Sequence, residues 1–126
     1  MMKNLITLLS VILLSSCATS YQSSGFTGGY VDTQLSETLW KVSVGGNGST
    51  SQSKIGDIAL LRASELTIDK GYKYFIIANR NQDKLTNITN RYSDEIVFEM
   101  LNDKIDGVFI YDAQIIYNSL SEKYIK

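Results

Sequence analysis

Residues 54–78, KIGDIALLRASELTIDKGYKYFIIA, decide the fold, because their apolar positions change from a helical to an extended pattern. In the first part, apolar residues recur at steps of three and four, which predicts an amphipathic helix of roughly four turns. Gly71 follows, at the position where many helices end in a left-handed residue. Residues 72–78 are then apolar enough for a strand inside a sheet. The stripe that we expect to pack against this sheet contains Ile58, Leu61 and Leu66.

Further elements are predicted on both sides of this stretch. Residues 39–44 alternate between apolar and polar side chains, which is typical of a half-buried strand. Residues 79–92 are polar and predict a loop or a loosely ordered hairpin arm. Residues 94–101 fit a strand and a helix face alike, and we interpret them as a strand. A short strand at 108–111 then precedes a final helix, which Asp112 caps and which carries Ile115, Ile116 and Leu120.

This order of elements predicts an α+β domain of two layers. We expect a small mixed sheet of three to four strands, with one long helix and one C-terminal helix packed on one face. Arg62 and Glu65 lie three residues apart on the long helix and should form a structural pair on its surface. The uncovered face of the sheet, or one of its edges, is where partners would dock.

The N-terminus has the layout of a bacterial lipoprotein signal. Lys3 gives a basic start, residues 5–14 are mostly apolar, and Leu14-Ser15-Ser16 precede Cys17, the only cysteine. This pattern resembles a lipobox, which implies cleavage between Ser16 and Cys17 and lipidation of the Cys17 thiol. An ordinary secretory signal is the main alternative. A membrane-spanning helix is disfavoured, because it would need about 20 apolar residues.

The signal divides the chain into three parts. Residues 1–16 would be the signal peptide, and residues 17–29 the lipid anchor with a flexible Ser-, Thr- and Gly-rich tether. Residues 30–126 would form one domain. Ala18, which follows the cysteine, resembles the outer-membrane sorting signal of enteric bacteria. We therefore expect an outer-membrane lipoprotein whose domain faces the periplasm and whose contact with the membrane is the N-terminal lipid.

The charge balance argues against nucleic acid as a partner. The chain has 12 basic and 13 acidic residues, and only Lys3 is lost with the signal, which leaves 11 against 13. This slightly acidic balance provides no basic patch for phosphate backbones or anionic headgroups. The partner that we expect is an unidentified envelope protein or cell-wall component.

The residue types exclude several kinds of catalysis. The sequence contains no histidine, so Ser-His-Asp and Cys-His mechanisms and Cys/His zinc sites are excluded. The glycine-rich residues 45–48 lack the Gly-Lys-Ser/Thr of a phosphate loop. Residues 102–107 superficially resemble a calcium loop, but Lys104 stands where an oxygen ligand is needed. We therefore predict no catalytic residue, no metal site and no cofactor.

Carboxylates and tyrosines are the remaining candidates for chemistry. Glu95 and Glu99 share a face if their segment is a strand, and solvation explains charged residues on such a face. A surface pair with Arg62 similarly explains the presence of Glu65 on the long helix. The chain has 8 tyrosines, and those in the expected strands are better explained by packing than by sugar stacking. They are Tyr72, Tyr74 and Tyr111.

Several short motifs resemble a family of small uncharacterised bacterial lipoproteins. They are Gly28-Gly29-Tyr30, Trp40-Lys41-Val42-Ser43-Val44, the helix motif Arg62-Ala63-Ser64-Glu65-Leu66-Thr67, Gly71-Tyr72 with Tyr74-Phe75, and Tyr111-Asp112-Ala113. This resemblance covers most of residues 28–78 and a short C-terminal piece, and Gln114 stands where the family usually has arginine. It implies a lipoprotein with a compact α+β domain. It implies no activity, substrate or catalytic residue.

These observations together predict a non-enzymatic lipoprotein of the cell envelope that binds another envelope component. One alternative is a carboxylate-dependent cell-wall hydrolase, which would need two carboxylates within about 10 Å of each other. The other is a lipoprotein that binds a small molecule in an aromatic pocket.

Overall fold

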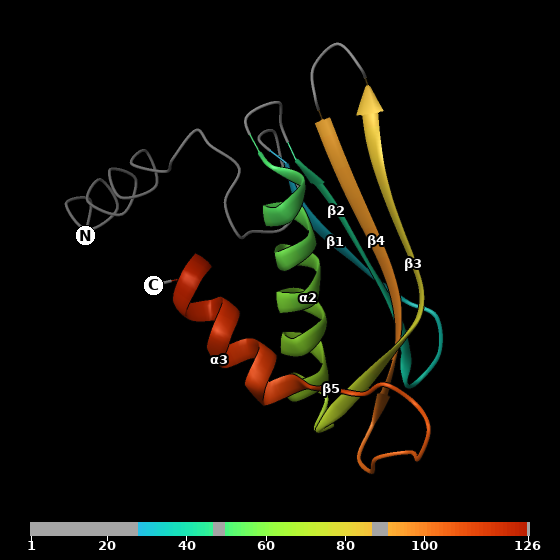
Figure 1. Cartoon of the computed structure of the whole chain (residues 1–126). Helices are drawn as coiled ribbons and strands as arrows, with labels where there is room; N and C mark the ends of the chain where they lie inside the picture. Colours follow the sequence, from blue (N-terminus) through green and yellow to red (C-terminus); the bar gives the residue numbers. More distant parts are fainter. Residues whose placement is uncertain (1–27, 47–49, 87–90, 126) are drawn as a thin grey trace, which may run out of the picture.

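A computed structural model describes residues 28–46, 50–86 and 91–125 of the chain (Figure 1). Within these ranges the chain forms five strands and two helices. In chain order they are β1 (Gly28–Gln34), β2 (Leu39–Gly46), α2 (Gln52–Asp69), β3 (Tyr74–Thr86), β4 (Arg91–Leu101), β5 (Tyr111–Asp112) and α3 (Ala113–Tyr124).

The strands form one sheet in the order β1-β2-β4-β3-β5, and each neighbouring pair is antiparallel. The predicted α+β class, with one long and one C-terminal helix, is confirmed. The prediction of a mixed sheet of three to four strands was wrong. β1 was missed because its sequence, GGYVDTQ, has one β-branched apolar residue and begins with two glycines. It starts at Gly28, inside the range predicted to be the tether.

Helix α2 runs from Gln52 to Asp69, about one turn longer than predicted, and has the predicted buried face. The Ser51 hydroxyl accepts a hydrogen bond from the backbone N–H of Lys54, which caps the start of the helix. At the other end, Gly71 has a φ of +88°, a conformation that a side chain disfavours. The predicted stripe is confirmed, because Ile58 and Leu61 are fully buried and Leu66 is 5% exposed.

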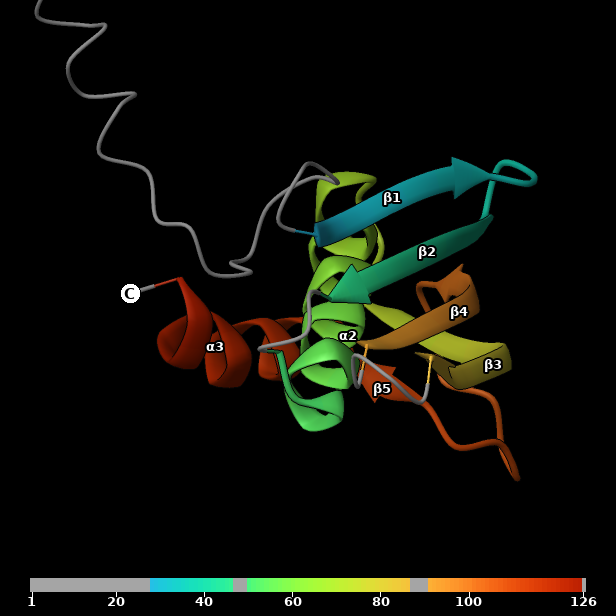
Figure 2. The same ribbon diagram turned by 90° about the horizontal axis from the view of Figure 1, so that it is seen from above.

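The core lies between α2 and the sheet, and α3 lies on the same side of the sheet, beyond α2 (Figure 2). Val42 and Val44 of β2 are buried there, as the alternation of residues 39–44 predicts. The rings of Phe75 and Phe98 meet edge to face, with centroids 5.6 Å apart, and join the central strands β3 and β4. The opposite face of the sheet is not covered by either helix.

β3 is longer than the sequence predicted. Residues 79–86 were expected to be a loop or a loose hairpin arm, but they continue β3 and pair with β4 through two register shifts. The prediction of a strand at residues 94–101 is confirmed by β4. The polar half of β3 is held by the side chain of Asp94, which is fully buried beneath α2. Arg80 and Gln82 both donate hydrogen bonds to this carboxylate.

The C-terminal helix packs on α2 more than on the sheet (Figure 1). Asp112 caps it as predicted, since its carboxylate accepts hydrogen bonds from the backbone N–H groups of Gln114 and Ile115. Only Tyr111 and Asp112 form β5, so most of the strand predicted at 108–111 is irregular. Ile115 is 65% exposed, because α3 turns a different face toward α2.

Candidate functional site

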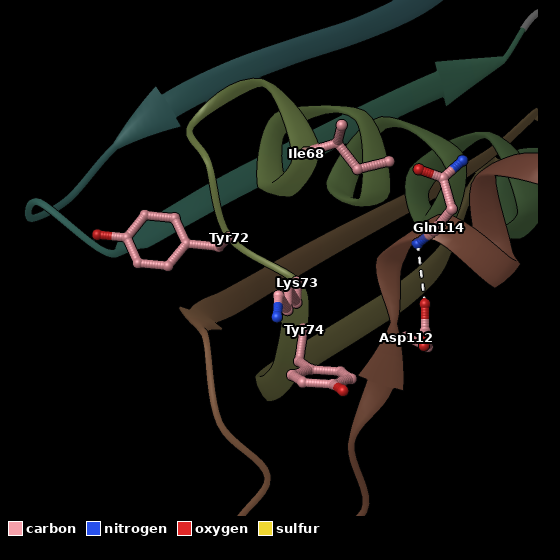
Figure 3. A pocket seen from close by; sticks show the side chains of 6 residues that line it. All are labelled: Ile68, Tyr72, Lys73, Tyr74, Asp112 and Gln114. Carbon is pink, nitrogen blue, oxygen red and sulfur yellow. Dashed lines mark hydrogen bonds between the residues drawn. The ribbon is translucent and has the colours of Figure 1, made fainter.

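A hollow of about 280 Å³ lies where α2 ends and α3 begins (Figure 3). Ile68 comes from the last turn of α2, and Gln114 from the first turn of α3. The hydrogen bond of 3.1 Å from the Gln114 backbone N–H to the Asp112 carboxylate fixes the start of α3 on one side of the hollow. The lining residues are Ile68, Tyr72, Lys73, Tyr74, Asp112 and Gln114.

A second hollow of about 230 Å³ adjoins the first, because Ile68 and Gln114 line both. Its other lining residues are Glu65, Asp69 and Tyr117. Glu65 and Asp69 are four residues apart on α2, so their Cβ atoms lie about 5–6 Å apart on one helix face. The two helices therefore hold a pair of carboxylates beside a tyrosine and an amide.

Burial raises the pKa of Glu65 to about 7, and the negative charge of Asp69 contributes to this rise. The guanidinium of Arg62, with Nη1 3.1 Å from Glu65 Oε1, favours the charged carboxylate and opposes the rise. Arg62 is shared, however, because its Nη2 lies 2.6 Å from Asp32 Oδ2 in β1. The predicted pair of Arg62 and Glu65 is thus confirmed, and Asp32 extends it to the edge strand.

These hollows can hold a small polar group, and their chemistry is limited. Two carboxylates in one hollow and a raised pKa on one of them are features that glycosidases also use. Each hollow is slightly smaller than the roughly 300–1,000 Å³ typical of sites for drug-sized ligands. Among residues 28–46, 50–86 and 91–125 there is no group of three or more His, Cys, Asp or Glu side chains that could hold a metal ion.

The other acids named from the sequence lie elsewhere. Glu95 and Glu99 share the sheet face opposite the helices, as expected for alternate residues of β4. Ser43 donates a hydrogen bond to Glu95, and Thr38 donates one to Glu99. Four residues of strand separate the two acids by about 13 Å. This exceeds the spacing of about 5–9.5 Å between the carboxyl groups of glycosidases.

The chain matches no protein-family model, no curated protein and no solved structure.

A third surface feature was missed by sequence reasoning. A shallow groove of about 420 Å³ runs between α2 and β3, and we call it the α2–β3 groove. The Asp94 carboxylate lies beneath it, 2.5 Å from Arg80 Nη2. No local pattern could show this pair, because the two residues meet only through the register of β3 on β4. The groove is lined by Gln52, Ser53, Gly56, Asp57, Leu60, Arg80 and Gln82.

The tyrosines named from the sequence mainly pack against neighbouring side chains. Tyr111 stacks on Phe75, with ring centroids 5.1 Å apart. Tyr74 faces the ammonium of Lys104 at 5.6 Å, and Tyr72 packs against the core. Tyr72 and Tyr74 also line the first hollow. Tyr117, in the second hollow, was not singled out by the sequence.

The predicted lipidation site lies outside the described residues. Ser16, Cys17 and residues 18–27 of the predicted tether all precede Gly28, where the description begins. In the part of the chain that the structure describes, neither helix is long and apolar enough to cross a membrane.

Proposed function

We propose that this chain is a lipid-anchored protein of the bacterial cell envelope and that its domain acts by binding another envelope component. One observation carries this proposal: both helices lie on the same side of the sheet, so among the described residues nothing covers the other face or the long edge of β3 beyond β5 (Figure 2). Sheet surfaces of this kind recognise partners through backbone and side-chain contacts.

The proposed location depends on the N-terminal sequence. Cys17 would carry a diacylglycerol and a fatty acid such as palmitate, after cleavage behind Ser16. More than one acyl chain gives stable anchoring, because each buried methylene contributes about 0.8 kcal/mol. Ala18 favours the outer membrane, with the domain in the periplasm. The resemblance to small bacterial lipoproteins supports the same proposal.

A second candidate function is carboxylate-dependent hydrolysis of cell-wall material. The observation that favours it is the pair of Glu65 and Asp69 in one hollow, with the pKa of Glu65 raised to about 7. Such a carboxyl group could donate a proton to a leaving oxygen while its neighbour stays ionised. The ion pair with Arg62 accounts for Glu65 equally well as a structural residue. Hydrolysis is therefore the second candidate and binding the first.

Complementation of a deletion strain distinguishes the two functions. Glu65→Gln and Asp69→Asn keep the shapes of the side chains and remove their acid chemistry. If the domain acts by binding elsewhere on its surface, both variants should restore the wild-type envelope phenotype. The control is Glu122→Gln on the exposed face of α3. A loss of function with Glu65→Gln or Asp69→Asn, in a folded and anchored protein, would favour the hydrolase.

A further inference from the structure

The edge of β3 is only partly covered by a neighbouring strand. β5 pairs with Tyr74 and Phe75 and goes no farther along β3. β3 continues to Thr86, and the order of the sheet places nothing else beside it on that side among the described residues. A vacant strand position therefore lies in line with β5, from Ile77 onward (Figure 1).

Backbone hydrogen-bonding groups point into this position. The N–H of Met100 donates to the carbonyl of Thr38, so the even-numbered residues of β4 direct their backbone groups toward β2. The odd-numbered residues face β3, where Val97 pairs with Asn79 and Glu95 with Asn81. Asn79 and Asn81 thus direct their backbone groups toward β4. Arg80 and Gln82, which alternate with them, direct their N–H and C=O groups outward, away from the sheet.

The α2–β3 groove lies beside the same edge, on its helix side. Gly56 keeps the groove open, because a Cβ atom at this position would lie 3.1 Å from Arg80 Nη2 and 3.3 Å from Gln82 Nε2. Alternate side chains of a strand added to β3 would point toward α2 and enter this groove. The edge thus offers both backbone partners and a place for side chains, which is the arrangement used for peptide recognition by strand addition.

We propose that the β3 edge from Ile77 to Asp83 binds an extended peptide segment of an envelope protein as an additional antiparallel strand, in line with β5. This proposal rests on the proposed binding function and names its surface. β5 already shows that an antiparallel strand fits at this edge. A single extended strand suits this site, because the shallow groove between α2 and β3 lies beside the edge and offers space for its alternate side chains.

The charges at the site specify the kind of peptide. Arg80 is paired with the buried Asp94, and Asp57 has Lys123 Nζ at 3.6 Å and the Tyr124 hydroxyl as a hydrogen-bond donor. Because these charges have partners within the chain, the groove favours uncharged polar side chains such as Ser, Thr or Asn.

An apolar anchor lies at one end of the vacant position. Phe109 precedes β5 by two residues and is 76% exposed, and its ring meets that of Tyr111 with centroids 5.0 Å apart. Tyr111 in turn stacks on Phe75 of β3. Phe109 therefore stands near the point where β5 stops and the open edge begins, where it would contact an apolar residue of the peptide.

A second copy of this chain fits the edge less well. If two β3 edges paired about a two-fold axis, the side chains offered to each groove would be those of Arg80 and Gln82 from the other copy. Both already bind Asp94 of their own chain, so they could not enter the neighbouring groove. An extended peptide has no such restriction.

The test uses the full-length chain in detergent micelles and an array of extended nonapeptides that vary in polar and apolar residues. Peptides with alternate uncharged polar residues followed by an apolar residue should bind best, because a strand that runs antiparallel to β3 reaches Phe109 with its C-terminal end. Ser53→Trp fills the groove from an exposed position on α2 and should weaken binding at least tenfold. Ser119→Trp, at an exposed position on α3, is the matched control and should change affinity less than twofold.

Backbone methylation of the best peptide separates strand addition from other modes of binding. N-methylation at the alternate residues that face β3 should abolish binding, while N-methylation at the intervening residues should have little effect. If both sets are tolerated, or Ser53→Trp binds normally, the β3 edge is not the site, although a binding function would stand. If light scattering shows a dimer that Ser53→Trp disrupts, a second copy is the occupant. If no peptide binds, the inference is wrong, and in-cell crosslinking decides separately whether the protein binds anything.

Discussion

Arg80 and Asp94 should respond unequally to truncation, although they are partners in one ion pair. Asp94 is 0% exposed at its side chain, whereas Arg80 is 27% exposed. Arg80→Ala leaves the buried carboxylate without its guanidinium. Asp94→Ala leaves a guanidinium that can turn toward water. We expect Arg80→Ala to destabilise the domain more.

The expected magnitudes follow from burial and from the hydrogen bonds that remain. An unpaired buried charge costs about 3–5 kcal/mol, and Gln82, with its Nε2 3.1 Å from Asp94 Oδ2, should keep Arg80→Ala near the lower value. Asp94→Ala removes several charge-assisted hydrogen bonds but leaves no buried charge unpaired, so about 1–3 kcal/mol is expected. The double variant should cost less than the sum, because the partners interact directly.

Urea unfolding of the three variants and the wild type measures these free energies. With a slope of about 1–3 kcal/mol per molar urea, a loss of 3 kcal/mol shifts the midpoint by about 1 M or more. Asn118→Ala on the exposed face of α3 serves as a surface control. If Asp94→Ala costs more than Arg80→Ala, or both cost under about 0.5 kcal/mol, the buried pair does not hold the polar half of β3 as described.

Three further predictions concern the helix, the hollow and the anchor. Leu66→Ala should lower the free energy of unfolding by about 2–5 kcal/mol, and a surface-like cost under about 0.5 kcal/mol would contradict its burial. Because the Glu65 carboxyl has a pKa of about 7 in the fold against 4.5 in the unfolded chain, the unfolded state loses its proton first as the pH rises. The free energy of unfolding, measured by urea titration, should therefore fall as the pH rises from about 4.5 to 7. Glu65→Gln should remove the part of this decline that Glu65 causes. An unchanged decline in Glu65→Gln would show that other groups cause it. Cys17→Ala should leave an unprocessed precursor that takes up no labelled palmitate, whereas a free Cys17 thiol on a cleaved wild-type chain, seen by mass spectrometry, would contradict the anchor.

The elements with strong local patterns could be predicted from the sequence. The helical stripe through Leu66, the left-handed Gly71 and the Asp112 cap each depend on residues within one or two turns, so their signals lie in short stretches. The alternation of residues 39–44 similarly identified β2 and its buried valines.

The elements whose stability comes from distant residues could not be predicted. β1 has a weak strand signal and is fixed by β2 and by Arg62, which binds Asp32. The polar half of β3 lacks β-branched residues between Ile77 and Asp83, and it is ordered by β4 and by the buried Asp94. No local sequence pattern indicates this pairing, because it depends on the register of β3 on β4.

The candidate sites show the same division. Glu65 was recognised as an acid on the long helix, and its neighbour Asp69 could have been found from the four-residue spacing. Gln114 and Tyr117 come from a different helix, and only the packing of α3 on α2 brings them to the hollow. The groove beside β3 required both the strand and the helix to be placed.

Photo-crosslinking in intact cells tests most directly whether the domain acts by binding at its open sheet edge. A photoreactive phenylalanine derivative would replace Asn81 on β3 in the full-length anchored protein, with the same derivative at Asn118 on α3 as the control. We predict a discrete adduct with one envelope protein from position 81, its loss in the Ser53→Trp background, and no such adduct from position 118. No adduct from position 81, or the same adducts from both positions, would contradict the account.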